Sequence, residues 1–555
     1  MTEAADPVEA ARAWAAQDPD EVTRAQLEAL LARCDAGDPD ARAELASRFA
    51  GRLAFGTAGL RGELGAGPLR MNRVLVGQAA TGLAAYLLAR EPHPSVVIGY
   101  DGRRNSEVFA RDTAEFMAGA GVRAILLPRL LPTPVLAFAV RHLEASAGVM
   151  VTASHNPASD NGYKVYLGGL DHGSQIVPPA DAEIQAEISR VAAGSIAELP
   201  RSTAYETAGE EMVDEYVRRT AALVTDPRPL RVVYTAMHGV GWETARRVFE
   251  AAGFPGVVSV AEQQDPDPAF PTVDFPNPEE PGAMDLAFAT AAQHGAELVI
   301  ANDPDADRVA VGIPDGQGGW QRLSGNEVGW LLGWRAARLA QGSDVDRGSF
   351  ACSLVSSPAL GVVARKEGFD FVETLTGFKW ISRAGDLLYG YEEALGYLVD
   401  PEKVRDKDGI SAAVAVLALF SELAATGQSF ADHRAAFADR YGAFASGQIS
   451  VRVSDLARIP ALMARLRSDA PREIGGIRIE RIDDFADGFG AFPPSDLLRY
   501  WLEGGSRVIV RPSGTEPKLK CYLDTRCDEG TPAERQAAAD AALAALDEGM
   551  RGLLS

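Results

Sequence analysis

The sequence has little cysteine and no long apolar run. Four cysteines occur among 555 residues, and their spacing fits neither a zinc pattern nor a dense disulfide framework. We therefore expect all four to be reduced. No apolar run reaches the roughly 20 residues of a membrane span, and residues 1–6 lack the basic and apolar segments of a secretory signal. These absences predict a cytoplasmic protein that does not bind a membrane.

Basic residues are also scarce relative to acidic ones. The chain has 54 lysines and arginines against 77 aspartates and glutamates, a net charge of −23. Nonspecific nucleic-acid binding needs a basic footprint, so we exclude nucleic acid as a partner. A local anion site is still compatible with this charge, because basic residues gather in several glycine-rich loops.

Apolar runs of strand length alternate with helical stretches, which predicts a mostly parallel α/β arrangement. Three such units follow one another, and the alternating residues 447–453 then indicate an antiparallel strand. The predicted fold is therefore α/β, with three similar mixed α/β domains in series and a smaller C-terminal α+β domain. The predicted divisions are 1–50 (a helical N-terminal extension packed on domain 1), 51–205 (domain 1), 206–320 (domain 2), 321–442 (domain 3) and 443–555 (domain 4).

Ser154 follows a predicted buried strand, residues 147–151, and lies in the turn Thr152-Ala153-Ser154-His155-Asn156-Pro157. Loops at strand ends often hold the chemistry of α/β proteins. A hydrolase elbow would need Gly-x-Ser-x-Gly, which is absent. We expect His155 to diverge from Ser154, because neighbouring side chains on a turn usually do. A phosphoryl-carrying serine and a plain turn serine both remain open on these residues.

Three aspartates at alternating positions, Asp303, Asp305 and Asp307, follow another predicted strand. In extended chain they face the same side, and three converging carboxylates suit Mg²⁺. An EF-hand is excluded, because Arg308 and Pro314 occupy its glycine and glutamate positions. The alternative is a solvated acidic turn.

Two loops have the composition of anion sites. Residues 511–518 combine Arg511 and Lys518 with two hydroxyls and the backbone N–H groups of residues 513–515, as an anion nest does. Residues 55–67 carry Arg61 among five glycines and are predicted to form a loop without regular structure. The alternatives are a hairpin turn with incidental charge and a glycine-rich connector with a solvated arginine.

Taken together and in order, these motifs resemble those of the α-D-phosphohexomutase superfamily, specifically the long-chain phosphoglucomutase/phosphomannomutase type, including its phosphopentomutase-like members. The four motifs are Thr152–Pro157, Asp303–Arg308, Gly390–Gly396 and Arg511–Pro517, and Phe55–Arg61 is similar to the family's N-terminal active-site loop. The resemblance covers nearly everything after residue 50. It implies domains arranged around a central cleft.

The resemblance also implies roles. Ser154 corresponds to the serine that carries the phosphoryl group. The metal ligands for one Mg²⁺ per chain would be Ser154, through its phosphoryl group, and Asp303, Asp305 and Asp307. Catalytic roles fall to Ser154, Arg61, His155, Lys164, Arg308, Lys379 and His238. Substrate binding falls to Thr57, Glu392, Ala394, Arg511, Ser513, Gly514, Thr515 and Lys518.

The implied activity is a phosphosugar mutase, an isomerase that interconverts hexose 1-phosphate and hexose 6-phosphate through a phosphoserine and a sugar 1,6-bisphosphate. The expected substrate is α-D-glucose phosphate, with glucose 1,6-bisphosphate as activator and intermediate. Glu392-Glu393-Ala394 departs from the frequent Glu-x-Ser pattern, so phosphopentomutase, phosphomannomutase and sugar-bisphosphate synthase remain alternatives, beside a non-enzymatic sugar-phosphate sensor. Small sugar phosphates are the expected partners, and we expect a monomer or a weak homodimer.

Overall fold

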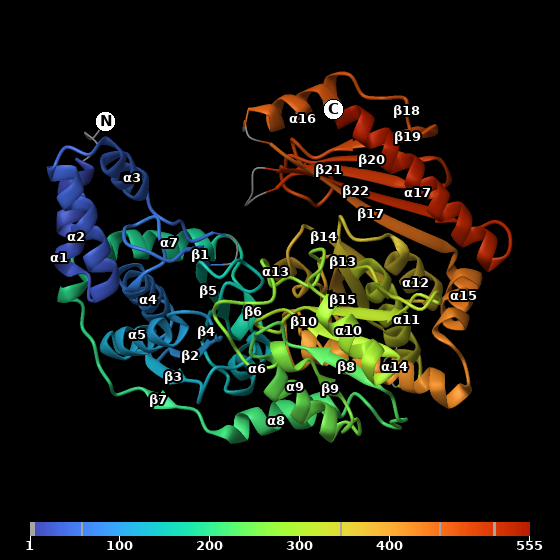
Figure 1. Ribbon diagram of the computed structural model, residues 1–555, viewed down its shortest axis with the longest axis horizontal. Helices are drawn as coiled ribbons and strands as arrows, with labels where there is room; N and C mark the ends of the chain where they lie inside the picture. Colours follow the sequence, from blue (N-terminus) through green and yellow to red (C-terminus); the bar gives the residue numbers. More distant parts are fainter. Residues whose placement is uncertain are drawn as a thin grey trace. The chain divides into compact units, whose positions relative to one another are not determined.

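The computed structural model describes residues 6–56, 59–343, 347–453, 455, 457–513 and 518–554. The chain divides into two compact units, which we describe separately. The first unit comprises the chain up to Leu323 together with Gly396–Ala418, and the second comprises Ser324–Leu395 and the chain from Leu419 onward. Figure 1 labels most of the helices and strands of both units.

Three helices lead the first unit: α1 (Pro7–Gln17), α2 (Glu21–Asp35) and α3 (Pro39–Phe49). Asp6 and Asp38 accept hydrogen bonds from the backbone N–H two residues further on, as N-caps before a first-turn proline do. The apolar faces of the three helices share a core with Val74 and Ile196. The extension is therefore packed on the part of the chain that follows it.

The first sheet contains the strand that leads to Ser154. Its strands are β1 (Leu60–Glu63), β2 (Ser95–Tyr100), β3 (Arg123–Leu126), β4 (Ala147–Val151), β5 (Asp160–Leu167), β6 (Ser174–Gln175) and β7 (Glu206–Thr207). The order is β1-β5-β4-β2-β3-β7, with β6 paired to β5. β2 is parallel to β3 and β4, whereas β5 is antiparallel to β4 and β1.

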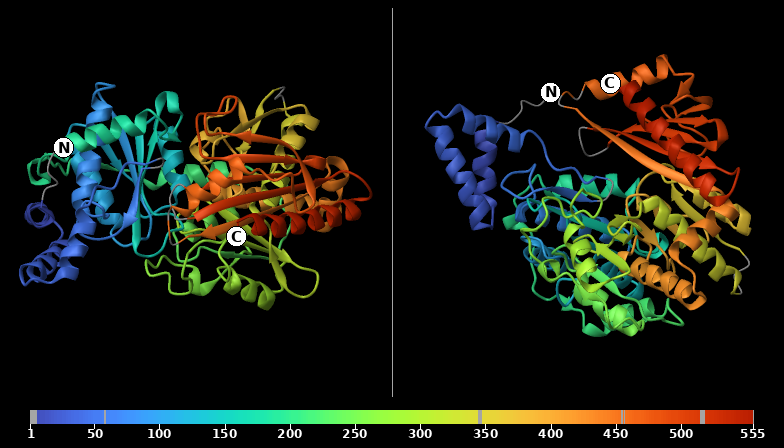
Figure 2. Two further views of the ribbon diagram at one scale, coloured as in Figure 1. Left: turned by 90° about the horizontal axis from the view of Figure 1, so that it is seen from above. Right: turned by 45° about the vertical axis from the view of Figure 1, so that its right-hand side comes forward.

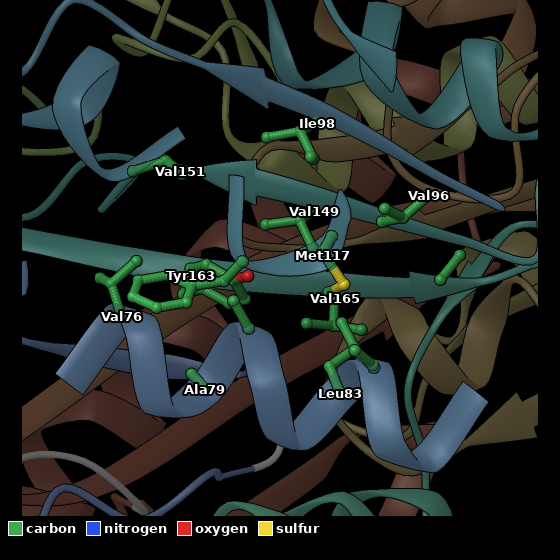
Figure 3. Close-up of a cluster of buried hydrophobic side chains, with 14 of the residues drawn as sticks. Val76, Ala79, Leu83, Val96, Ile98, Met117, Val149, Val151, Tyr163 and Val165 are labelled. Carbon is green, nitrogen blue, oxygen red and sulfur yellow. The ribbon is translucent and has the colours of Figure 1, made fainter. Parts of the chain in front are cut away.

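Helices cover both faces of this sheet: α4 (Arg73–Leu88), α5 (Ser106–Gly119), α6 (Thr133–His142) and α7 (Ala180–Val191). Val149 of β4 faces α4, where Leu83 joins the same cluster (Figure 3). On the opposite face Gly148 lies so close to α6 that an added Cβ would meet Val140 at 2.3 Å. Burial on both faces explains why β4 is a continuous apolar run, and this packing fixes the strand end from which Ser154 follows.

The second sheet places the aspartate motif. Its strands are β8 (Val232–Thr235), β9 (Val258–Ser259), β10 (Leu298–Asn302), β11 (Val309–Pro314) and β12 (Trp320–Arg322), in the order β12-β11-β10-β8-β9. The helices of this part are α8 (Glu210–Ala221), α9 (Gly241–Ala251) and α10 (Asp285–His294). β10 is parallel to β8 and antiparallel to β11. The aspartate motif forms the turn between β10 and β11.

The segment Gly396–Ala418 also belongs to the first unit. It contains β16 (Gly396–Leu398) and the first part of α14 (Gly409–Thr426). Tyr166 Oη and Gln175 Nε2 donate to Asp406 Oδ2 over 2.9 and 2.7 Å. α14 is long and apolar enough to cross a membrane, yet 72% of the helix is buried within the protein, as in the core helix of a globular domain.

The second unit begins with a sheet in which β13 (Ser349–Ser353) lies between β14 (Asp370–Thr374) and β15 (Leu387–Glu392), parallel to both. Its helices are α11 (Gly325–Gln341), α12 (Ala359–Glu367), α13 (Phe378–Ile381) and α15 (Phe430–Tyr441). Lys379 lies in α13, which follows β14, and Glu392 is the last residue of β15.

The C-terminal sheet is antiparallel, in the order β17-β22-β21-β20-β19-β18. Its strands are β17 (Ala443–Arg452), β18 (Glu473–Ile474), β19 (Ile477–Asp484), β20 (Leu498–Leu502), β21 (Arg507–Pro512) and β22 (Lys518–Cys527). Two helices, α16 (Arg458–Ser468) and α17 (Pro532–Leu554), share its core. Figure 2 shows α17 along β17 and β22. The 3₁₀ turns are η1 (Gly169–Asp171), η2 (Ile196–Glu198), η3 (Ala261–Gln263) and η4 (Glu503–Gly505).

The predicted fold class is confirmed, and the four cysteines are free thiols. The prediction that residues 55–67 lack regular structure is wrong. β1 lies within them and pairs with β5, with Leu60 opposite Tyr163. Glycine permits this approach, because a Cβ on Gly59 would meet the Tyr163 carbonyl oxygen at 1.8 Å. The glycines therefore serve a close strand contact as well as a turn.

Candidate active site

Ser154 lies at the end of β4 and is 2% exposed. Its φ of 52° is in the left-handed region, which is uncommon for a residue other than glycine and often marks a functional position. The Ser154 N–H donates to Thr152 Oγ1 over 2.8 Å, and its hydroxyl donates to Asp303 Oδ2 over 2.9 Å. The serine hydroxyl is thus held beside the aspartate motif.

His155 contacts the same hydroxyl, with Nδ1 3.2 Å from Ser154 Oγ. The expectation that the two side chains diverge is therefore wrong. It assumed an ordinary turn, whereas the left-handed backbone at Ser154 changes the direction of its side chain. Burial and the positive charges of Arg308 and Arg61 lower the pKa of His155 well below its usual value, which favours the neutral imidazole.

The three aspartates converge, as predicted, but in a tight turn and not in extended chain. The turn has Ala306 at φ 54°, and one carboxylate oxygen of each aspartate lies within 4.8 Å of the others. All three side chains are buried. Among the described residues they form the one cluster of acidic, histidine or cysteine side chains that could hold a metal ion. A solvated acidic turn is thereby excluded.

Two lysines and a threonine contact these carboxylates. Lys164 Nζ on β5 lies 2.7 Å from both Asp305 Oδ2 and Asp307 Oδ2. Lys407 Nζ lies 3.0 Å from Asp307 Oδ2, and Thr133 Oγ1 donates to Asp305 Oδ2 over 2.6 Å. The sequence reasoning assigned no role to Lys407 or Thr133. The dense charges of Arg405–Gly409 and the position of Thr133 at the start of a helix were the available signals.

The electrostatics of the cluster are asymmetric. Burial and the neighbouring charges of Asp305 and Asp307 raise the pKa of Asp303 well above its usual value. Burial alone would also raise the pKa of Asp307, but Lys164 and Lys407 hold it below its usual value. Lys164, Lys407 and the nearby Arg308 guanidinium favour ionised carboxylates here, yet the pKa of Asp303 stays raised. A divalent cation among the three carboxylates would favour the ionised form of Asp303 as well.

The residues present fit a magnesium ion. Asp305 Oδ1 and Asp307 Oδ1 are buried and have no hydrogen-bond partner, which is unusual for buried polar atoms. Hard carboxylate oxygens are the ligands that Mg²⁺ prefers. The site therefore has the donor atoms, the negative charge and the unpaired oxygens that this cation requires.

Three further predicted residues of the first unit, Arg61, Arg308 and His238, differ in how close they lie to Ser154 and the aspartates. Arg61 on β1 donates from Nη1 to Asn156 Oδ1 over 3.1 Å, which places it at the Ser154 loop. Arg308 follows the aspartate turn directly, and its Nη1 lies 4.0 Å from a Glu279 carboxylate oxygen. His238 Nε2 contacts Thr272 Oγ1 at 2.8 Å, whereas the hydroxyl of Ser154 has hydrogen bonds with His155 and Asp303 and none with His238.

The second unit holds the remaining predicted residues. Lys379 in α13 is 6% exposed, and Arg511 on β21 donates from Nη1 to Thr376 Oγ1 over 3.0 Å. The loop that carries Lys379 therefore lies beside Arg511. Ser513 N donates to the Lys518 carbonyl oxygen over 2.8 Å at the base of the β21–β22 loop. Thr57, Gly514 and Thr515 lie outside the described residues.

Glu393, which lies between Glu392 and Ala394, has hydrogen bonds that hold this loop. Glu393 Oε2 accepts from Ser353 Oγ over 3.0 Å and from Ser356 Oγ over 2.9 Å. The Glu393 N–H donates to Ser356 Oγ over 3.1 Å. These bonds fix the backbone of the loop, whereas Glu392 ends β15 one residue earlier.

Comparison with known proteins identifies the family. The chain matches four domain descriptions of one family, "Phosphoglucomutase/phosphomannomutase": alpha/beta/alpha domain I over residues 52–194, domain II over 214–316, domain III over 324–441 and the C-terminal domain over 449–542. The protein belongs to the phosphoglucomutase/phosphomannomutase family. It is therefore an enzyme of the phosphomutase superfamily, with phosphotransferase and isomerase chemistry, and the resemblance inferred from the motifs is confirmed.

Relatives of this phosphomutase carry different names. A Haemophilus influenzae protein named "Probable phosphomannomutase" is 56% identical over 87% of this chain and 98% of its own length. A Mus musculus protein named "Phosphopentomutase" is 35% identical over 92% and 89%. A solved Burkholderia thailandensis "Phosphoglucomutase/phosphomannomutase family protein" has a TM-score of 0.69 at 21% identity, covering 91% of this chain and 97% of that one. The last similarity concerns the fold alone.

Membership in the family supports some of the finer predictions and leaves others open. The aspartate triad corresponds to the superfamily's Mg²⁺ site. The glucose preference, the individual residue roles and the domain boundaries stay predictions, as do the cytoplasmic location and the oligomeric state.

Proposed function

We propose that this phosphomutase transfers a phosphoryl group between O1 and O6 of a hexose phosphate, with α-D-glucose phosphate as its preferred substrate. The observation that carries the proposal is the position of the Ser154 hydroxyl, 2.9 Å from Asp303 and beside a carboxylate cluster that fits a divalent cation. Phosphoryl transfer depends on positioning and charge neutralisation more than on a strong nucleophile. Asp303 positions the hydroxyl of this serine, and the carboxylate cluster could hold a cation that neutralises charge.

The proposed cycle uses Ser154 twice. Its phosphoryl group passes to the free hydroxyl of the sugar phosphate: the bond between phosphorus and the serine oxygen breaks, and a bond between phosphorus and the sugar oxygen forms. The sugar hydroxyl loses its proton in this step and the serine oxygen gains one, so the proton count balances. The resulting 1,6-bisphosphate reorients within the site, and Ser154 then accepts the phosphoryl group from the other phosphorylated oxygen of the sugar. While the serine is unphosphorylated its hydroxyl hydrogen is directed at Asp303 Oδ2, and we assign to His155, whose Nδ1 lies 3.2 Å from the same oxygen, the orientation of this hydroxyl.

The remaining residues divide between charge and recognition. Arg61, Lys164 and Arg308 stabilise the negative charge of the transferring phosphoryl group. Magnesium, held by the triad and a phosphoryl oxygen on Ser154, would supply further charge neutralisation. In the second unit, we assign Lys379, Glu392 and Ala394 to sugar recognition. The phosphate that is not transferred is assigned to Arg511, Ser513, Gly514, Thr515 and Lys518, and Thr57 is assigned to substrate binding.

Mannose phosphate is the second candidate, because the relative at 56% identity is named "Probable phosphomannomutase". Ribose phosphate is the third, since a relative at 35% identity is named "Phosphopentomutase". Sugar-bisphosphate synthesis would use the same serine with an external phosphoryl donor, and it differs in producing bisphosphate as a net product.

The full-length protein tests these alternatives directly. Intact-mass measurement should detect one phosphoryl adduct on the wild type and on Ser159→Ala, whose serine is exposed, but not on Ser154→Ala. Coupled assays with glucose, mannose and ribose 1-phosphates should give the highest kcat/KM for glucose. A higher value for another sugar overturns the glucose assignment. Net bisphosphate formation supports the synthase, and a protein without adduct or Mg²⁺-dependent turnover is no mutase.

A further inference from the structure

A buried arginine joins the Ser154 loop to the neighbouring strand. Arg103 lies in the turn after β2, and its side chain is 2% exposed. Its terminal nitrogens donate to three backbone carbonyl oxygens of the Ser154 loop, residues 152–159 between β4 and β5, and to one at the start of β5. Nη1 donates to Pro157 (2.7 Å) and to Asp160 of β5 (3.1 Å), and Nη2 donates to Ser154 (2.6 Å) and Asn156 (2.6 Å).

These contacts use both terminal nitrogens of the guanidinium, whereas Nε makes no hydrogen bond. Its two Nη atoms carry four hydrogens, which is one for each of the four carbonyl oxygens. The remaining Nε lies 3.5 Å from Asp101 Oδ2, so the charge is paired as well. A lysine offers three donors from a single point, and it cannot reproduce the planar fork.

The support behind Arg103 is itself anchored. Asp101 Oδ1 accepts from the Arg103 N–H over 3.0 Å and from Ser106 Oγ over 2.6 Å. Asn161 Nδ2 donates to the same Ser106 hydroxyl over 3.0 Å. Polar contacts thus link the end of β2 to the Ser154 loop through Arg103, and to β5 through Ser106 of α5 and Asn161.

The loop needs such support, because Ser154 has a left-handed backbone with φ of 52°. A residue in this conformation persists only where its surroundings determine it. Arg103 binds the carbonyl oxygen of Ser154 itself and that of Asn156, on either side of His155. The guanidinium therefore holds the backbone that directly follows the serine whose hydroxyl meets Asp303.

We propose that Arg103 is a positioning residue that sets the orientation of Ser154 for phosphoryl transfer. It acts through the backbone of the loop, so its loss should slow the transfer and leave the affinity for sugar phosphate nearly unchanged. The inference rests on the proposed phosphoserine function and adds a residue to it.

The test compares Arg103→Lys and Arg103→Ala with Arg104→Ala, whose arginine is the exposed neighbour. Phosphorylation of Ser154 by glucose 1,6-bisphosphate is followed by intact mass in single turnover, together with steady-state kcat and KM. We expect both Arg103 variants to lose about 100-fold in transfer rate and kcat, with KM within about threefold of the wild type. Methylguanidinium should restore part of the rate to Arg103→Ala but not to Arg103→Lys, whose side chain occupies the site.

Three results would overturn the proposal. The first is a transfer rate within about threefold of the wild type in both Arg103 variants, and the second is an equal loss of transfer rate in Arg104→Ala. The third is a rise in KM as large as the fall in kcat. Thermal unfolding separates positioning from folding. If both Arg103 variants are unfolded and methylguanidinium restores no activity, Arg103 is a stability residue and the proposal is wrong. Failure of the wild type itself to carry a phosphoryl group would instead overturn the proposed function.

Discussion

Ser154 Oγ and Asp303 Oδ2 are 2.9 Å apart although 149 residues separate them in the sequence. One follows β4 of the first sheet and the other follows β10 of the second. The contact places the serine hydroxyl at the edge of a carboxylate cluster whose Asp305 and Asp307 each keep one unpaired buried oxygen. A change at this metal site should therefore affect both Mg²⁺ binding and phosphoryl transfer at Ser154, and both can be measured.

Asp303→Asn should weaken Mg²⁺ binding and reduce kcat by at least about 100-fold, because one of three ligands loses its charge. Binding can be read without turnover: a ligand that binds only the folded state raises the melting temperature in proportion to ln(1 + [L]/Kd). We expect the Mg²⁺-dependent rise of the wild type to be reduced in Asp303→Asn. The control Asp274→Asn, at an exposed position, should keep the full rise. An equal rise in all three proteins would contradict the assignment.

Lys407→Met tests the effect of the lysine ammonium group at the aspartate triad separately from the effect of Mg²⁺. Lys407 lies 3.0 Å from Asp307 and competes with a metal ion for its charge. Its removal should therefore leave Mg²⁺ affinity equal or higher, while kcat falls because a cation is lost near the transferring group. Magnesium titration of the melting temperature and of activity would show both effects.

The control for this prediction is Lys366→Met, at an exposed lysine, which should change neither quantity. A weaker Mg²⁺ affinity in Lys407→Met would mean that Lys407 supports the triad structurally, and that the competition between the two cations is not the dominant effect.

The sequence predicted the parts of the site that are local in the chain. Alternating aspartates predicted a cation cluster, and the turn after a buried strand predicted the place of Ser154. Lys407 was missed because its role depends on Gly396–Ala418 returning to the first unit after the intervening Ser324–Leu395. No local pattern signals that return.

The missed geometry has a common cause. The contact between His155 and Ser154 follows from a left-handed backbone, and the strand β1 follows from a close approach between Gly59 and Tyr163. Both depend on tertiary packing that overrides the usual turn preferences. Arg103 was overlooked for a related reason: its partners are backbone carbonyl oxygens, which carry no residue-type signature in a sequence.

Glu393 should affect sugar specificity through the loop and not through direct contact. Its carboxylate accepts from both Ser353 and Ser356, and Glu393→Gln weakens these bonds. We expect KM for glucose 1-phosphate to rise several-fold and the preference over mannose 1-phosphate to fall, with kcat less affected. Glu392→Gln should lower kcat/KM more, because that carboxylate is the one assigned to the sugar.

A double-mutant cycle with Ser353→Ala tests the mechanism. If Glu393 acts through this hydroxyl, the two substitutions should be non-additive by about 0.5–1 kcal/mol or more. Additive effects would show that Glu393 acts independently of Ser353, and a larger loss in Glu393→Gln than in Glu392→Gln would reverse the proposed roles of the two carboxylates.

His433 should make the second unit sensitive to mild acid. It lies in α15, 4% exposed, with its ring stacked on Trp334 at 4.5 Å between centroids. Burial and the charge of Arg338 lower the pKa of His433 to about 4. Between pH 6.5 and about 4 the unfolded chain therefore binds a proton that the folded chain excludes, so stability falls as pH falls through this window and is unaffected above it.

His433→Phe should remove this loss while keeping the aromatic stack. The difference in free energy of unfolding between His433→Phe and the wild type should grow by about 2 kcal/mol as the pH falls from 7.5 to 5. It is measured from denaturant unfolding curves at both pH values, as the midpoint multiplied by the slope m. His93→Ala, at an exposed histidine, should show no such difference. A constant offset between His433→Phe and the wild type at both pH values would mean that packing, and not protonation, governs this position.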